Sequence, residues 1–117
     1  MRDIEFHKPI ASRRYTFAPR KGRSYPVTVS IGKPYSRGRP AQWLCRYRIT
    51  GAGKVRTLAM AGADSMQALL LAAQILRVEL ELWARTEKGK FLYDGQPKLF
   101  LPVLTAGRRK TSRRNAN

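Results

Sequence analysis

The stretch that decides the fold lies near the middle of the chain and runs Trp43-Leu44-Cys45-Arg46-Tyr47-Arg48-Ile49-Thr50. Large apolar side chains alternate with cationic ones along it. Successive side chains of a β-strand point to opposite faces of a sheet, so the apolar residues share one face while Arg46 and Arg48 share the other. The pattern predicts a strand with one buried face, in which Cys45 is an inert core residue.

Three further strands are expected beside this one. The segment Gly51-Ala52-Gly53 turns the chain back into a strand at residues 54–61, which predicts an antiparallel hairpin. Upstream, alternating patterns predict strands at residues 13–17 and 25–31, joined by a basic turn. Residues 32–40 contain two glycines, two prolines and three cationic residues, so we expect a mobile basic loop there.

A long helix is expected after the hairpin. Asp64 or Ser65 can accept hydrogen bonds from the free amide groups of the first turn, and Gln67 stands at capping-box spacing from Asp64. No glycine or proline occurs from Met66 to about Arg85, where the helix is expected to end. The apolar side of the helix is predicted to consist of Leu69, Leu70, Ala73, Leu76, Leu80 and Trp83.

Together these elements predict the α+β fold class. We expect an antiparallel sheet of about four strands packed on one long helix, with the other face of the sheet open to solvent or a partner. Residues 91–93 and 98–101 flank a turn sequence, which predicts a short C-terminal hairpin or an irregular apolar strap. Residues 1–106 are then a single domain, and residues 107–117 are a disordered basic tail.

Two sequence motifs carry a resemblance to a known family. One is a W-x-C-x-Y-x-I strand at residues 43–49, and the other is a G-x-D-S-x-Q-A-L helix start at residues 62–69. In these motifs the chain resembles a family of small bacterial proteins described only as a domain of unknown function. The resemblance covers about residues 12–104 and implies that the motif residues determine the fold. The same order of strands and helix is also loosely similar to that of small antitoxin and immunity domains.

The charge of the chain indicates the class of its partner. The 117 residues include 24 Lys and Arg against 7 Asp and Glu, which gives a formal net charge of +17. Twelve basic residues fall within residues 1–48 and five within residues 106–117, where no acidic residue occurs. Because such self-repulsion adds nothing to the stability of a fold, the imbalance favours a polyanionic partner, with RNA or DNA first.

The candidate nucleic-acid-binding residues are cationic side chains on strands, turns and the tail. Arg46 and Arg48 must project to one face, with the basic turn and the basic loop at its rim, and Tyr25 or Tyr35 is available to stack on a base. No motif for sequence-specific recognition is present. The full set is Arg13, Arg14, Arg20, Lys21, Arg23, Lys33, Arg37, Arg39, Arg46, Arg48, Arg108, Arg109, Lys110, Arg113 and Arg114.

Three alternatives stay open from the sequence. In the first, the basic surface is only solvated and has no physiological polyanion. In the second, the chain is an immunity or antitoxin-like module whose basic face docks an acidic protein. In the third, exposed apolar side chains make the open face of the sheet a homodimer contact, through Leu44, Leu58 and Met60.

No catalytic site, metal site or cofactor is predicted, so we expect a protein that is not an enzyme. The only histidine, His7, has no ligand or nucleophile at useful spacing, and helix capping accounts for Asp64. Cys45 is the only cysteine, which excludes an internal disulfide. The segment Gly51-Ala52-Gly53-Lys54 lacks the spacing of a phosphate loop. With no secretory signal and no long apolar run, we expect a soluble, cytoplasmic protein without a membrane partner.

Overall fold

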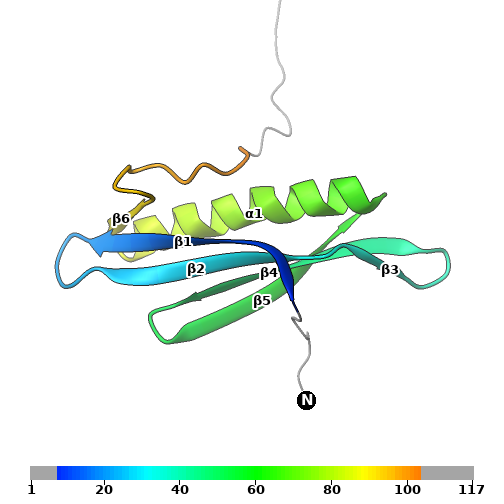
Figure 1. Cartoon of the computed structure of the whole chain (residues 1–117), viewed down its shortest axis with the longest axis horizontal. Coiled ribbons are helices and arrows are strands. Elements are labelled where there is room, and N and C mark those ends of the chain that lie inside the picture. The colour runs from blue at the N-terminus through cyan, green and yellow to red at the C-terminus, as the bar shows by residue number, and fades with distance from the viewer. Residues whose placement is uncertain (1–7, 104–117) are drawn as a thin grey trace, which may run out of the picture.

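A computed structural model of the chain describes residues 8–103, and they form an α+β fold (Figure 1). A curled antiparallel sheet packs against one long helix, which confirms the predicted fold class. In chain order the elements are β1 (Pro9–Pro19), β2 (Tyr25–Gly32), β3 (Tyr35–Arg37), β4 (Gln42–Gly51), β5 (Lys54–Gly62), α1 (Ser65–Thr86) and β6 (Gly89–Leu92).

Strand β4 is the centre of the sheet. Strand β5 pairs along one of its edges, while β2 and β3 follow each other along the opposite edge. Strand β1 pairs with β2, and β6 pairs with the end of β1. All of these pairings are antiparallel, so the order across the sheet is β5, β4, then β2 with β3, then β1, then β6. The hairpin predicted around Gly51-Ala52-Gly53 is confirmed as β4 and β5.

Two segments differ from the sequence prediction. The expected mobile loop at residues 32–40 contains the short strand β3, whose residues pair with the first residues of β4. After the helix, β6 joins the edge of the sheet beside β1 instead of forming a hairpin with residues 98–101. Residues 97–103 are without regular secondary structure and form the alternative that the sequence left open, an irregular strap.

The core lies between α1 and the sheet face that the odd-numbered residues of β1, β2 and β4 cover. Its largest buried side chains are Tyr15, Phe17, Tyr47, Leu76 and Leu80. Cys45 is also fully buried, which confirms the prediction of a core thiol. Small residues make the contact close, because Ala68 and Ala72 are completely buried on the helix side.

The buried side of α1 is narrower than predicted. It consists of Ala68, Ala72, Leu76 and Leu80, four residues apart along the helix. Leu70 was predicted to belong to the apolar side that packs on the sheet, and this is wrong, because its side chain is 47% exposed. Beside this row, Leu69, Ile75 and Trp83 are partly buried and also pack against the core, while other apolar residues of the helix face solvent.

The start of α1 follows the capping prediction. The carboxylate of Asp64 accepts a hydrogen bond from the backbone N–H of Gln67 at 2.7 Å. The side-chain oxygen of Gln67 in turn accepts from the backbone N–H of Ala63. At the other end, the backbone N–H of Glu87 donates to the carbonyl of Trp83. The predicted tail at residues 107–117 and His7 lie outside the described residues.

Candidate polyanion-binding surface

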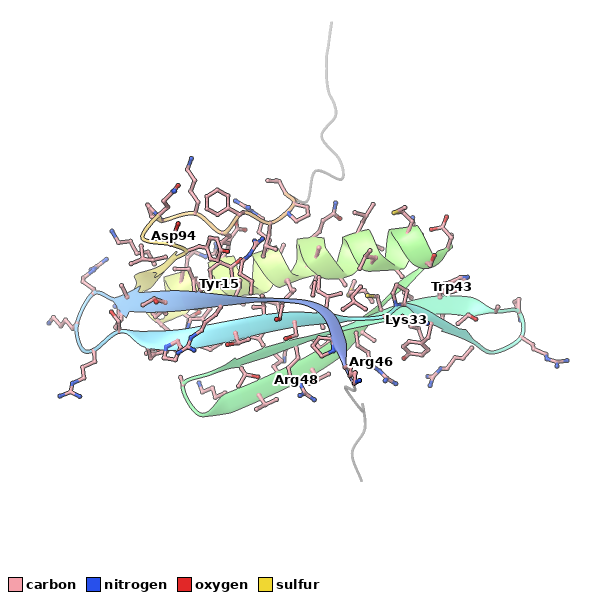
Figure 2. The ribbon with its side chains drawn as sticks, viewed as in Figure 1. Tyr15, Lys33, Trp43, Arg46, Arg48 and Asp94 are labelled. Atoms are coloured by element: carbon pink, nitrogen blue, oxygen red, sulfur yellow. The ribbon has the colours of Figure 1, made fainter. Side chains whose placement is uncertain are left out.

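The face of the sheet that points away from α1 carries the predicted cationic residues of β4. We define the open face as the side chains that the strands direct to this side. Alternation along β4 places Arg46 and Arg48 there, while Cys45 and Tyr47 are buried on the other side. Figure 2 shows Arg46 and Arg48 on the opposite side of the sheet from Tyr15 and α1.

The strand register adds a third arginine and a row of hydroxyl groups to the open face. Arg14 of β1 lies opposite Thr28 of β2, on the side away from the helix. In the next row along the sheet, about 7 Å away, Ser30 lies opposite Arg48. Hydroxyl side chains on this face are Ser12, Thr16, Thr28, Ser30, Thr50 and Thr57.

Neighbouring side chains hold two of these guanidinium groups in place. The Nε of Arg48 donates a hydrogen bond to the Oγ1 of Thr57 at 3.1 Å. The guanidinium carbon of Arg46 lies 4.6 Å from the centre of the Tyr35 ring, a cation–π contact. Both contacts orient the arginines across the sheet and reduce the side-chain freedom that binding would have to remove.

The two tyrosines proposed for base stacking have different positions. Tyr35 belongs to the open face, where its ring is already stacked against Arg46. Tyr25 is on the helix side, and its hydroxyl accepts a hydrogen bond from the Nε1 of Trp83 at 3.1 Å. Its ring packs against Phe17, so Tyr25 is partly buried at the edge of the core and does not belong to the open face.

Of the remaining predicted cations of strands and loops, Arg37 lies opposite Gln42 on the open face and Lys33 lies between β2 and β3, while the others lie in turns at the ends of the sheet. Figure 1 shows the turn between β1 and β2 at one end and the turn between β3 and β4 at the other. The first turn carries Arg20, Lys21 and Arg23, and the second lies between Arg37 and Gln42 and carries Arg39. The fold therefore spreads the cations of these turns along the length of the sheet, with Arg14, Arg46 and Arg48 between them.

Arg13 does not belong to the open face. It has the same strand parity as Tyr15 and therefore points to the helix side of β1. Its guanidinium donates hydrogen bonds to the carbonyls of Leu99 at 3.0 Å and Phe100 at 2.6 Å. It also lies 5.0 Å from the ring centre of Tyr93. These contacts fasten the strap to the sheet, so Arg13 has a structural role.

One cation of the open face was missed by the sequence analysis. Lys90 lies opposite Ala18 in the pairing of β6 with β1, on the side away from the buried Phe91. Exposed Lys90 followed by buried Phe91 repeats the alternation of cationic and apolar residues in β4. The sequence analysis missed Lys90 because it did not expect a strand at this position to join the sheet. The predicted residues Arg108, Arg109, Lys110, Arg113 and Arg114 lie outside the described part of the chain.

The carboxylates of residues 8–103 are separated from this surface. Within residues 8–103 there are five, and none belongs to a β-strand. Glu79 pairs with Arg56 on the helix side at 2.6 Å, and Glu81 pairs with Arg77 at 3.0 Å. The others are Asp64 and Glu87 at the two ends of α1, and Asp94 in the turn after β6. Figure 2 shows Asp94 on the helix side of the sheet.

Comparison with known proteins places this architecture in a family. The model of a domain of unknown function, DUF6968, matches residues 11–103, from β1 to the strap. The chain belongs to this family. The match confirms the resemblance that the two sequence motifs suggested. No curated protein matches the chain, and no solved structure does.

The titratable groups in the core of the DUF6968 domain are kept neutral. Burial raises the pKa of the Cys45 thiol from 9.0 to about 11, so it is not a reactive thiolate at neutral pH. Burial also raises the pKa of Tyr47, and its hydroxyl donates to the Glu79 carboxylate, which raises it further. Burial raises the pKa of Tyr15, whose hydroxyl donates to the carbonyl of Leu99. The side chains of Cys45, Tyr47 and Tyr15 therefore contribute to the packing of the core.

Other kinds of site find no support in the part of the DUF6968 domain that is described. No group of three His, Cys, Asp or Glu side chains within residues 8–103 has the geometry of a metal site. In the same residues, no helix is long and apolar enough to cross a membrane. Two grooves, of about 620 and 420 Å³, run along the flanks of α1 and not on the open face.

Proposed function

We propose that this domain binds nucleic acid or another polyanion through the open face of its sheet, without strong sequence specificity. One observation carries the proposal. Within residues 8–103 the open face has Arg14, Arg37, Arg46, Arg48 and Lys90 and no carboxylate, while the five carboxylates are in or near α1 or in the turn after β6. A cationic surface attracts an anionic ligand from a distance.

The chemistry of the open face suits phosphate groups. A guanidinium presents a planar fork of N–H donors that matches two phosphate oxygens. Serine and threonine hydroxyls between the arginines are additional donors of the kind that contact sugar–phosphate backbones. Because the contacts of Arg46 with Tyr35 and of Arg48 with Thr57 limit their motion, less entropy is lost when a ligand binds.

The proposal is tested by removing charge from the open face and, in a matched control, from elsewhere. One variant carries Arg14→Gln, Arg46→Gln and Arg48→Gln. Its control loses three exposed cations at and beyond the end of α1, through Arg85→Gln, Lys88→Gln and Lys98→Gln. Both variants lower the net charge equally, so only the position of the lost charge differs between them.

Fluorescence anisotropy with single- and double-stranded oligonucleotides is measured at rising salt. For duplex DNA the plot of log affinity against log salt should become shallower by about 2.7 in the open-face variant, or about 0.9 for each lost phosphate contact. The control variant should keep a slope close to that of the parent. Equal losses in the two variants, or no binding of the parent even at low salt, would refute the proposal. Thermal melting checks that both variants are folded.

A further inference from the structure

The side of α1 that points away from the sheet exposes large apolar side chains among its polar ones. Four large side chains are exposed along it, namely Met66 at 63%, Leu70 at 47%, Val78 at 39% and Leu82 at 53%. They follow one another at intervals of four residues, with Gln74 at the middle position. We call these five residues the outer ridge.

The outer ridge lies on the opposite side of the helix from the core. The buried row begins at Ala68 and also advances in steps of four. Ala68 follows Met66 by two positions, which correspond to about 200° of rotation around an α-helix. Because both rows have the same step, they stay opposite each other along the whole helix. Neither the sheet nor the strap therefore covers the outer ridge, as its exposed fractions show.

The outer ridge is symmetric about its centre. Counting outward from Gln74, Leu70 and Val78 stand four residues away, and Met66 and Leu82 stand eight residues away. A symmetric dimer uses the same surface patch on both copies, so its contacts must be self-complementary. When two copies of α1 are laid antiparallel across a twofold axis at Gln74, each apolar residue of one copy meets an apolar residue of the other. The two Gln74 amides meet at the axis, where each can donate a hydrogen bond to the other.

We propose that a second copy of this chain covers the outer ridge, in an antiparallel dimer of α1 helices that cross near Gln74. Rows of side chains spaced by four residues are the ridges that pack in the commonest class of helix pair, with axes about 8–10 Å apart. Antiparallel alignment also places Arg85, in the last turn of one helix, toward the same end of the contact as Asp64 at the start of the other. Opposite charges and opposite helix dipoles then attract each other at both ends of the contact.

The size of the surface fits a second copy. Added together, the exposed fractions of the four apolar residues amount to the surface of about two fully exposed residues. This area is in the range of the largest apolar patch on a typical monomer. A stable interface buries about 800 Å² on each partner, so the ridge is the apolar centre and the polar residues beside it are the rim. This rim includes Gln67, Glu81 and Arg85.

The structure makes the open face a poor dimer contact by comparison. Of the residues on which that prediction rested, Leu58 and Met60 pack against the core on the helix side, and only Leu44 is on the open face. Two open faces brought together would also oppose Arg46 and Arg48 of one copy to the same arginines of the other. A dimer through the outer ridge instead leaves both open faces pointing outward.

Oxidative cross-linking tests the position of the twofold axis. At an axial distance of about 8–10 Å, residues on the axis come within disulfide reach. The variant Gln74→Cys is therefore expected to form a covalent dimer under mild oxidation, while buried Cys45 stays unreacted. Its control is Thr86→Cys, an exposed position twelve residues from the axis, about 36 Å from the same residue of the second copy. Absence of cross-linking at Gln74, or equal cross-linking at both positions, would overturn the proposal.

Sedimentation velocity over a concentration series tests the ridge itself. The full chain is expected to form dimers as its concentration rises. The double variant Leu70→Gln with Val78→Gln should stay monomeric at the concentrations where the parent is dimeric, with an unchanged melting temperature. The control Val55→Gln changes a valine on the open face that is 65% exposed, more than Leu70 or Val78, and should leave the dimer intact. A monomeric parent at every concentration, or a double variant that still forms dimers, would contradict the proposal.

Discussion

Adding one methyl group at Gly62 should destabilise the domain strongly. Gly62 is the last residue of β5, where the strand passes beneath the first turn of α1. A Cβ atom at this position would lie 2.5 Å from the backbone nitrogen of Ala68 and 2.9 Å from its Cα. Ordinary contact begins at 3.4 Å, so the start of the helix has to move by about 1 Å. The conflicting atoms are helix backbone and cannot rotate away.

The cost of Gly62→Ala has two parts. Forcing extra volume into a packed contact costs about 1–3 kcal/mol. Moving the first turn also disturbs the hydrogen bond between Asp64 and the N–H of Gln67, and losing a helix cap costs about 1 kcal/mol. The free energy of unfolding should therefore fall by about 2–4 kcal/mol. For a domain of this size the melting temperature should fall by at least about 10 °C.

Thermal unfolding followed by circular dichroism measures this loss. Gly53→Ala is the control, because a Cβ there meets nothing within 4 Å and only the left-handed backbone, at φ +75°, disfavours alanine. That strain costs about 1–2 kcal/mol. If Gly62→Ala lowers the melting temperature no more than Gly53→Ala does, the close approach of β5 and α1 is not what requires a glycine here.

Two further outcomes follow from the core. Because burial raises the pKa of Cys45 from 9.0 to about 11, its contribution to stability is complete below pH 9 and is lost as the pH rises through 11. In urea unfolding, the free energy of unfolding of the parent should fall by about 3 kcal/mol between pH 9 and pH 11 more than that of Cys45→Ala. If the free energy of unfolding falls equally with pH in the two proteins, this prediction is refuted. Leu76→Ala should lower the free energy of unfolding by about 2–5 kcal/mol, since Leu76 is completely buried. Leu70→Ala should lower it by less than about 1 kcal/mol, because Leu70 is exposed. Equal losses in urea unfolding would contradict this orientation of the helix.

Local patterns made the central elements predictable. The alternation around Cys45 marks a strand because one of its faces is buried and the other is not. Asp64 and Gln67 mark the start of α1 because both satisfy amide groups of the first turn. These signals depend on neighbours in the sequence, so they could be recognised without knowing the tertiary structure.

The edges of the sheet could not be predicted in the same way. Strand β3 has three residues and gains its hydrogen bonds from the extension of β4 beyond β2, which is visible only once β4 is placed. Strand β6 has four residues and pairs with β1, about seventy residues away in the sequence. Where strands this short form depends on the neighbouring strand with which they pair, and not on the pattern of their own residues.

The candidate surface was partly predictable. The shared direction of Arg46 and Arg48 follows from their spacing alone, and it holds. The position of Arg13 could have been inferred too, because a strand that buries Tyr15 and Phe17 directs residue 13 to the same side. What the sequence could not supply is the strap, whose carbonyls accept the hydrogen bonds of this arginine.

The two proposed surfaces belong to opposite layers of the molecule, which makes them independent. The outer ridge and the open face are separated by α1, the core and the sheet. Substitutions at sites more than about 10 Å apart without shared partners usually act additively. Removing the arginines of the open face should therefore leave the dimer intact, and removing the ridge should leave the affinity of each monomer for a polyanion unchanged. A dimer whose open faces point in opposite directions can then hold two segments of one polyanion, or two separate strands, at once.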